Sequence, residues 1–291
     1  MKRAAVIGAS SMLGSEIIRQ LSLAGISIIR IGRDLTNDVS VDLASLDFNQ
    51  TCLNGQRADV LFHCASSFGG LNFSGLCENF SVNTSGAKIA VLIAKELGCE
   101  KLVFSGSAFS DPSVDPQSYP SYGLSKACCE EILKAGAVEN EISFCSLRFS
   151  QLYDTHGHSR IHQPWFARIV AYISRGLDLG LPASTSPRNY LHVLDAARLM
   201  IASAGSDLEG IWNACHRENL NCTELAELAR DVFASDSKIF IDKMKAPFRA
   251  IKYPRQFGIY EALGIQPLIS MREGLSMIQK SETYANFGEP D

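Results

Sequence analysis

The chain has 291 residues, of which 46% are hydrophobic and 20% are charged, a composition typical of a soluble globular protein with a substantial core. Its formal net charge of −4 gives no general attraction for nucleic acids or anionic membranes, so neither partner is expected. No apolar run approaches the length of a membrane span, and at about 150 residues per domain the length predicts two domains.

Cysteine usage and the N-terminus indicate the compartment. The nine cysteines are odd in number and include no Cys-x-x-Cys pair, which favours reduced thiols over a disulfide framework. The apolar residues 4–7, which follow Lys2 and Arg3, are too few for a signal peptide, and Gly8 interrupts them. We therefore expect a cytoplasmic protein.

The first elements form a strand, a glycine-bearing turn and a helix. Residues 4–7 are apolar throughout, as in a buried parallel strand, and residues 15–24 show helical spacing. A tight turn between such elements directs backbone N–H groups toward a pyrophosphate, although Ser11 stands where the usual dinucleotide pattern has its middle glycine. The alternative is a strand–helix turn without a ligand. The predicted cofactor contacts are Gly8, Ser10, Ser11, Met12, Leu13 and Gly14.

The end of the second strand, residues 27–31, bears on the choice of nicotinamide cofactor. An acidic residue there accepts from a ribose 2′-hydroxyl, whereas an arginine pairs with a 2′-phosphate. Arg33 comes before Asp34, which favours NADP over NAD; the alternative is that Arg33 is a solvated loop charge. A third strand is expected to end at residues 41–43, where Asp42 could reach the adenine amino group and Leu43 would line the cofactor site.

Two further strands bring candidate residues to the same edge of the sheet. Residues 58–65 form a buried strand in which His63 is interpreted as a packed core residue, and Cys64, Ala65 and Ser66 are predicted cofactor contacts. A long helix over residues 76–97 carries Asn83, another predicted contact. The next strand, residues 101–105, ends in Ser105-Gly106-Ser107, at the edge where open parallel sheets bind ligands.

A proline-rich loop leads to the helix that contains Tyr122 and Lys126. Side chains four residues apart share one face of a helix, so the lysine ammonium is expected to lower the tyrosine pKa from about 10 toward neutral. A tyrosine tuned in this way is a general acid–base. Together with Ser107 and the glycine-bearing turn, this pair predicts an oxidoreductase-type site.

Strands and helices alternate up to residue 150, with a sixth strand at residues 143–149, which predicts an α/β fold with a Rossmann-type, doubly wound parallel sheet. We expect a dinucleotide-binding domain over residues 1–150, to which residues 188–215 return. Residues 151–187 and 216–291 would form a smaller, irregular substrate-binding part, packed with the first around one cleft. His156, His158 and His162 are interpreted as part of a solvated loop, and no metal site is predicted.

Several short motifs occur in the order and with the separations of one known family. They are Gly8 to Gly14, Phe62-His63-Cys64-Ala65, Asn83, Phe104-Ser105-Gly106-Ser107, Tyr122 with Lys126, Leu147-Arg148-Phe149, and residues 188–195. By these motifs nearly the whole chain resembles the extended short-chain dehydrogenases/reductases, the group of nucleotide-sugar epimerases, dehydratases and reductases. The resemblance implies that Ser107 hydrogen-bonds the reacting oxygen, that Tyr122 shuttles the proton, and that Lys126 holds the nicotinamide ribose.

The same resemblance implies contacts to the substrate and to a second copy of the chain. Arg188 is the implied partner of a substrate diphosphate, and either Arg249 or Arg255 would supply a second arginine, with surface ion pairs as the alternative for all three. A homodimer through the helices that start near Asn79 and Ser121 is also implied.

The reaction type follows from what stands beside Ser107. Dehydratases of the family place an Asp-Glu pair there, whereas this chain has Ala108-Phe109, so water elimination is not expected. Arg33 and the short C-terminal part resemble the 4-ketoreductases, which implies NADPH-dependent reduction of a nucleotide-linked 4-keto-6-deoxy sugar. The alternatives are a nucleotide-sugar epimerase with tightly bound NAD and a non-catalytic dinucleotide-binding protein.

Overall fold

The computed structural model describes residues 1–45, 48–266 and 269–290, which form two compact units. Unit 1 comprises Met1–Phe149, Ala196–Ala214 and Gln256–Ile265, and unit 2 comprises Ser150–Asp195, Cys215–Arg255 and Gln266–Asp291. The chain returns to unit 1 at Ala196, later than the predicted residue 188.

Residues 256–265 belong to unit 1, although the sequence analysis assigns them to the C-terminal part. The physical reason is a helix, α8 (Gly258–Ala262), that packs against the edge strand β10 (Gly210–Ala214). Just before this helix, the side chain of Gln256 accepts a hydrogen bond from the Nδ2 of Asn213 at 2.8 Å. An edge strand is thereby covered by a segment distant in sequence.

Among the described residues, unit 1 contains one sheet of seven strands in the order β10-β6-β5-β4-β1-β2-β3, with every neighbouring pair parallel. Besides β10, its strands are β1 (Arg3–Ile7), β2 (Ser27–Gly32), β3 (Val39–Ser40), β4 (Val60–His63), β5 (Lys101–Ser107) and β6 (Ser143–Phe149). Because the strand order reverses between β1 and β4, ligands of such a fold bind outside the carboxyl ends of these strands. The predicted doubly wound sheet is confirmed.

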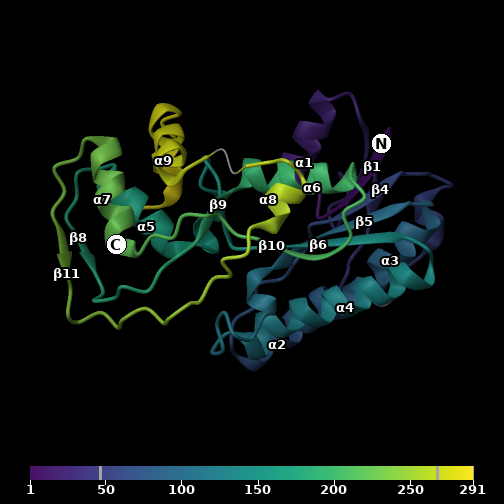
Figure 1. Ribbon diagram of the computed structural model, residues 1–291, viewed down its shortest axis with the longest axis horizontal. Helices are drawn as coiled ribbons and strands as arrows, with labels where there is room; N and C mark the ends of the chain where they lie inside the picture. Colours follow the sequence, from purple (N-terminus) through teal and green to yellow (C-terminus); the bar gives the residue numbers. More distant parts are fainter. Residues whose placement is uncertain (46–47, 267–268, 291) are drawn as a thin grey trace. The chain divides into compact units, whose positions relative to one another are not determined.

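Helices cover both faces of this sheet. Those of unit 1 include α1 (Met12–Leu23), α2 (Phe73–Asn79), α3 (Gly86–Glu96) and α4 (Leu124–Glu139), and α6 (Val193–Ala204) crosses the boundary between the units. Helices α3 and α4 pack against each other on one face, and α1 lies on the opposite face (Figure 1). Burial on both faces explains why β4 is apolar at three successive positions.

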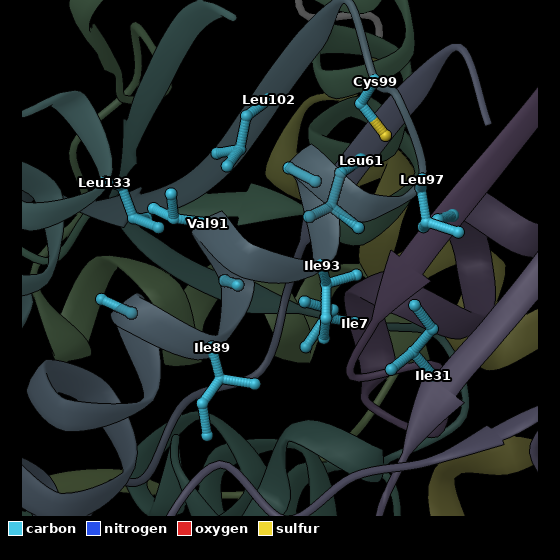
Figure 2. Close-up of a cluster of buried hydrophobic side chains, with 14 of the residues drawn as sticks. Ile7, Ile31, Leu61, Ile89, Val91, Ile93, Leu97, Cys99, Leu102 and Leu133 are labelled. Carbon is cyan, nitrogen blue, oxygen red and sulfur yellow. The ribbon is translucent and has the colours of Figure 1, made fainter. Parts of the chain in front are cut away.

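The core of unit 1 lies between the sheet and α3. Figure 2 shows Ile7, Ile31 and Leu61 of the strands close to Ile93 of the helix, and these four side chains are at most 1% exposed. Burying each such side chain contributes about 1.5–3 kcal/mol to folding. The strands are therefore held in a fixed plane, and their carboxyl ends are rigid supports for a site.

Two helices of unit 1 contain a turn of π-helix, which sequence periodicity does not predict. The expected helix over residues 76–97 consists of α2, the π segment Phe80–Ser85 and α3. A second π segment, Tyr119–Gly123, leads into α4. Such widened turns are rare and are frequent at functional sites.

Unit 2 consists of short strands and helices around its own core. Two pairs of parallel strands, β7 (Gln151–Tyr153) with β9 (Tyr190–His192) and β8 (Leu179–Leu181) with β11 (Ile239–Ile241), accompany the helices. The helices are α5 (Pro164–Ile173), α7 (Cys222–Phe233) and α9 (Met271–Lys280). Capping boxes begin both α7 and α9, since Asn221 pairs with Glu224 and Ser270 with Glu273.

One close approach fixes α9 in this core. A Cβ atom at Gly274 would lie 2.0 Å from the hydroxyl of Tyr153, whose ring is 1% exposed. Only glycine therefore fits at this point of the helix. Within the described ranges, none of the helices combines the length and the hydropathy that crossing a bilayer requires.

Candidate active site

The turn between β1 and α1 depends on its two glycines. Gly8 has φ +81°, and a Cβ atom there would lie 2.6 Å from the backbone nitrogen of Ala65. A Cβ atom at Gly14 would lie 2.2 Å from the carbonyl oxygen of Gly8. The glycines therefore let the turn lie against the end of β4 and the start of α1, which is the cradle that a dinucleotide pyrophosphate needs.

Ser11 is the N-cap of α1. Its hydroxyl accepts a hydrogen bond from the N–H of Gly14 at 3.0 Å, which accounts for the serine at the position of the usual glycine. The neighbouring Ser10 is exposed and Met12 is half-buried, whereas the Leu13 side chain is buried in the core. Of the predicted contacts in this turn, Leu13 can therefore offer only backbone atoms to a ligand.

Arg33 and Asp34 are both exposed beyond the end of β2. The carboxylate of Asp34 accepts from the N–H of Thr36 at 3.0 Å, so it is used within the turn. The carboxylate of Asp42 likewise accepts a hydrogen bond from the N–H of Ala44. Leu43 is buried against α3, where a Cβ atom added at Gly86 would lie 2.8 Å from the Leu43 Cβ.

The end of β4 is packed more tightly than the end of β2. His63 is 1% exposed with its ring centroid 5.3 Å from that of Phe104, and burial lowers its pKa to about 3, so the imidazole is neutral. Cys64 is also buried, and burial raises the pKa of its thiol to about 12. Both residues are therefore uncharged, buried side chains at the carboxyl end of β4.

Asn83 joins the loop after β4 to α4. Its Oδ1 accepts from the N–H of Ser67 at 2.8 Å and from the hydroxyl of Ser66 at 3.1 Å. Its Nδ2 donates to the carbonyl of Ser67 at 3.1 Å and to the hydroxyl of Ser125 at 3.0 Å. The amide is thus fully used within the protein, so the predicted cofactor contact is better described as a support of the site.

Asn79, one helical turn earlier, makes a second connection of the same kind and is missing from the sequence prediction. It exchanges hydrogen bonds with the backbone of Gly69 at 2.7 and 3.1 Å and donates to the hydroxyl of Ser121 at 2.9 Å. The signal in the sequence is the four-residue spacing from Asn83. Both amides are at most 2% exposed, and together they fix the loop next to Tyr122.

Ser107 and Tyr122 meet at the carboxyl end of β5. The phenol group lies in the interior and hydrogen-bonds the side chains of Ser107 and Ser66. The outer face of its ring stacks on Phe68, with centroids 4.8 Å apart and an interplanar angle of 23°. The structure therefore brings together the predicted serine and tyrosine.

Lys126 lies on the same helix but contacts the preceding residues of β5. Its Nζ donates to the carbonyl of Ser105 at 2.8 Å and lies 4.2 Å from the centroid of the Phe104 ring. It is 2% exposed, and burial lowers the pKa of its ammonium group. Lys126 is thus anchored to the strand and not to the tyrosine.

The predicted lowering of the Tyr122 pKa by Lys126 is wrong for this structure. Burial raises the pKa of Tyr122 to about 12, and the bonds to Ser107 and Ser66 oppose this rise only in part. The physical reason is that the ammonium is directed at Ser105 and at the ring of Phe104. At neutral pH the phenol is therefore protonated and acts as a donor.

A buried ion pair lies one turn further along α4. The carboxylate of Glu130, which is 0% exposed, accepts from the Nε of Arg148 at 2.9 Å and from the hydroxyl of Ser146. Arg148 belongs to the motif Leu147-Arg148-Phe149, whereas Glu130 has no place in the sequence prediction. The pair connects α4 to β6.

In unit 2, the guanidinium of Arg188 lies against the backbone of Arg249, which comes from a distant segment of the chain. The guanidinium donates to the hydroxyl of Ser186 at 3.0 Å and to the carbonyls of Pro187 at 2.8 Å and Arg249 at 3.4 Å. The structure therefore places the two predicted arginines next to each other. The side chain of Arg249 is exposed, as is that of the alternative, Arg255.

Two of the three histidines that follow β7, His156 and His158, bond to one carboxylate. Asp154 accepts from the N–H of His156 at 3.0 Å and from the ring of His158 at 2.8 Å. In the part of the chain that the structure describes, no group of three or more His, Cys, Asp or Glu side chains is placed to hold a metal ion.

Comparison with known proteins connects this geometry to a family. A family model described as NAD dependent epimerase/dehydratase family matches residues 4–215. The UDP-glucose 4-epimerase of Lacticaseibacillus casei is 24% identical over 227 residues, which are 66% of this chain and 69% of that protein.

Two solved structures share the fold over nearly their whole length. The UDP-N-acetylglucosamine 4-epimerase from Bacillus cereus superposes with a TM-score of 0.78 at 20% identity, covering 97% of this chain and 99% of its own. RMD from Pseudomonas aeruginosa, complexed with NADPH, gives a TM-score of 0.77 at 17% identity, covering 98% and 99%. The chain belongs to the NAD dependent epimerase/dehydratase family and is an NAD(P)-dependent enzyme of the extended short-chain dehydrogenase/reductase type.

Proposed function

We propose that this enzyme reduces the keto group of a nucleotide-linked 4-keto-6-deoxy sugar with NADPH. The observation that carries the proposal is the position of the Tyr122 phenol, hydrogen-bonded to Ser107 at the carboxyl end of β5. Reduction of a carbonyl needs a proton donor at the oxygen, and a phenol whose pKa is about 12 is in its donor form at neutral pH. Ala108 and Phe109 offer no acid–base pair for a dehydratase reaction.

The residues present fit a dinucleotide, because Gly8 and Gly14, where a Cβ atom would strike the backbone of Ala65 and the carbonyl of Gly8, permit the tight turn before α1 that receives a pyrophosphate. The turn over residues 8–14 would hold the pyrophosphate, and Lys126 the nicotinamide ribose. When bound, the cofactor supplies the hydride. The protein then has two tasks: Ser107 orients the carbonyl oxygen, and Tyr122 donates a proton to it as negative charge develops.

The preference for NADPH rests on Arg33. Its side chain is exposed beyond β2, while the carboxylate of Asp34 is engaged with Thr36. A guanidinium there can pair with the 2′-phosphate, whereas one oxygen of Asp34 already accepts a hydrogen bond within its own turn. RMD from Pseudomonas aeruginosa is complexed with NADPH, which supports the same choice.

The proposed diphosphate site lies in unit 2. Arg188 is 9% exposed and its guanidinium lies 5.1 Å from the ring centroid of Phe248, so it is already held in one place. A guanidinium fixed in this way can bind a phosphate with little loss of side-chain freedom. Arg249 would add a second positive charge beside it.

The second candidate is a nucleotide-sugar 4-epimerase with tightly bound NAD, which the similarity to the Lacticaseibacillus casei enzyme favours. An epimerase would use the same Ser107–Tyr122 pair, with the tyrosine first as a base and then as an acid. Membership of a family of enzymes sets aside the non-catalytic alternative.

The deciding experiment mixes the enzyme with NADPH or NADH and a panel of nucleoside-diphosphate 4-keto-6-deoxyhexoses. Stoichiometric loss of the reduced-nicotinamide absorbance, faster with NADPH, is expected. UDP-glucose incubated with the enzyme and NAD is the parallel test for epimerisation. Product sugar in the second test, with no absorbance loss in the first, would replace the reductase by the epimerase.

A homodimer through α3 and α4 is part of the same proposal. These helices pack against each other, and Leu92 and Val138 on them are 38% and 73% exposed, which leaves apolar surface for a partner. Light scattering should give twice the 31.7 kDa chain mass. Replacing Val138 by Asp should return the protein to a monomer.

A further inference from the structure

Helix α4 presents a third polar side chain to the sheet, four residues beyond Lys126. Glu130 is 0% exposed, and its carboxylate is held by Ser146 and by the Nε of Arg148 at 2.9 Å. A buried ion pair is weak support for stability, because desolvating the two charges offsets much of their attraction. Its presence under the site therefore calls for a role other than holding the fold together.

The sheet leaves a space for this carboxylate. A Cβ atom at Gly106 would lie 2.5 Å from the Oγ of Ser146 and 3.1 Å from the Oε1 of Glu130, so only glycine admits the carboxylate between α4 and the sheet. Lys126 of α4 and Tyr122 of the π segment before it bond to the strand residues on either side of Gly106. The carbonyl of Ser105 accepts a hydrogen bond from the Nζ of Lys126, and the side chain of Ser107 hydrogen-bonds the phenol of Tyr122.

We propose that Glu130 is a positioning residue for Tyr122 and Lys126. Its bonds to Arg148 and Ser146 fix the register of α4 on β6, the strand paired with β5, and its negative charge balances the lysine ammonium. The inference rests on the proposed roles of the tyrosine and the lysine. The ion pair of Glu130 and Arg148 thereby supports proton transfer, because the phenol oxygen of Tyr122 must stay within hydrogen-bond reach of the substrate.

The charges around Lys126 single out Glu130. His63 at the end of β4 is neutral because burial lowers its pKa to about 3, and burial raises the pKa of the thiols of Cys64 and Cys129 to about 12. Among these neighbours Glu130 is the carboxylic acid side chain. Cys129 and Glu130 raise the pKa of Lys126, against the stronger effect of burial.

The groups beyond the carboxylate complete the local balance. Arg148 is paired with Glu130 and is 21% exposed, so part of its charge is solvated. Its charge also acts on Asp111, whose pKa is lowered mainly by hydrogen bonds from Ser113. Removing the negative charge of Glu130 would leave Arg148 and Lys126 as two buried or half-buried cations on one side of the sheet.

The charge is tested with Glu130→Gln, and Glu131→Gln is the matched control because Glu131 is exposed on the same helix. The pKa of Lys126 is read by NMR of the protein with ¹³C-labelled lysine ε-carbons, the resonance being assigned with Lys126→Arg. Glu130→Gln should lower this pKa by about one unit, because a nearby carboxylate favours the charged ammonium. Equal values in the two variants would overturn the proposal.

The position is tested with Glu130→Asp, which keeps the charge but shortens the side chain by one methylene. With the keto-sugar nucleotide of the panel that is turned over fastest, kcat should fall about 10-fold with KM unchanged, because only the proton donor has moved. The pKa of Lys126 should stay near its wild-type value. A wild-type kcat for Glu130→Asp would contradict the positioning role. This test holds even if Glu130→Gln does not fold.

These results remain separable from the proposed function. The NMR titration needs no substrate, so it decides the electrostatic claim even if no keto sugar is reduced. If Tyr122→Phe lowers turnover but the Glu130 variants behave like Glu131→Gln, the reductase stands and the positioning role falls. If Tyr122→Phe leaves turnover unchanged, the proposed chemistry falls instead.

Discussion

The end of β5 in unit 1 and the loop around Arg188 in unit 2 hold polar groups in opposite ways. Tyr122 and Lys126 meet a strand about twenty residues earlier in the chain, within a fully packed sheet. Arg188 is held by its own neighbours, Ser186 and Pro187, and by one carbonyl of Arg249. The side chains of unit 1 are therefore held by a strand distant in sequence, whereas Arg188 is held mainly by residues next to it in the chain.

This difference suggests a division of labour that experiments can break. If the sheet edge carries the chemistry and the loop carries recognition, substitutions in unit 1 should change kcat and those in unit 2 should change KM. Tyr122→Phe and Arg188→Met test this division directly, while Gly274→Ala tests the packing of unit 2 and Arg33→Ser the choice of cofactor.

Tyr122→Phe should have the largest effect, because it removes the proton donor and leaves the ring stacked on Phe68. Turnover should fall about 10³-fold, the usual contribution of a general acid, with little change in NADPH affinity. Steady-state kinetics and fluorescence titration measure the two quantities. Loss of cofactor binding in this variant would mean that the sheet edge does not separate chemistry from binding.

Gly274→Ala tests whether unit 2 has a rigid core under its irregular loops. The new Cβ would lie 2.0 Å from the hydroxyl of Tyr153, so the variant should lose about 3 kcal/mol of stability. Thermal unfolding should shift down by roughly 6–12 °C. Gly205→Ala is the control, since its Cβ would meet no atom closer than 3.8 Å. Equal melting temperatures of the two variants would show that the core of unit 2 rearranges to accept the added methyl group.

Arg188→Met keeps the length of the side chain and removes its charge. If the guanidinium binds the substrate diphosphate, KM should rise about 30-fold at unchanged kcat, the effect of losing one charged hydrogen bond of about 2 kcal/mol. Initial rates over a range of substrate concentrations decide this. A fall in kcat instead would tie the loop to the chemical step.

Arg33→Ser should have the smallest effect, because the arginine is exposed and solvent weakens its pairing. The ratio of kcat/KM for NADPH to that for NADH should fall about 10-fold, with the NADH value unchanged. Parallel assays with the two cofactors give the ratio. An unchanged ratio would remove the basis for preferring NADP.

Regular elements of unit 1 could be predicted because strand burial and helix periodicity act locally. The strand at residues 143–149 has the predicted bounds, and the glycine at position 14 is required by the carbonyl of Gly8, an atom that the strand–turn–helix pattern brings close. The family resemblance is confirmed by the match over residues 4–215.

What sequence could not supply is the direction of each side chain. The spacing of Tyr122 and Lys126 is correct, but whether the ammonium meets the phenol or a strand carbonyl depends on how α4 lies on β5. Asn79 was not predicted for a similar reason, because its hydrogen-bond partners Gly69 and Ser121 are 10 and 42 residues away in the chain. The expected contact of Asn83 with the cofactor assumed a free amide, and tertiary packing uses that amide fully.

The π segment Tyr119–Gly123 has a consequence for insertions and deletions. A helix with 3.6 residues per turn rotates by about 100° for each residue removed. Deleting Gly123 would therefore let the chain continue as ordinary α-helix, but Tyr122, which precedes the deletion, would turn away from Ser107 while Lys126 kept its place. The shortened helix would be more regular and would lack a proton donor at the end of β5.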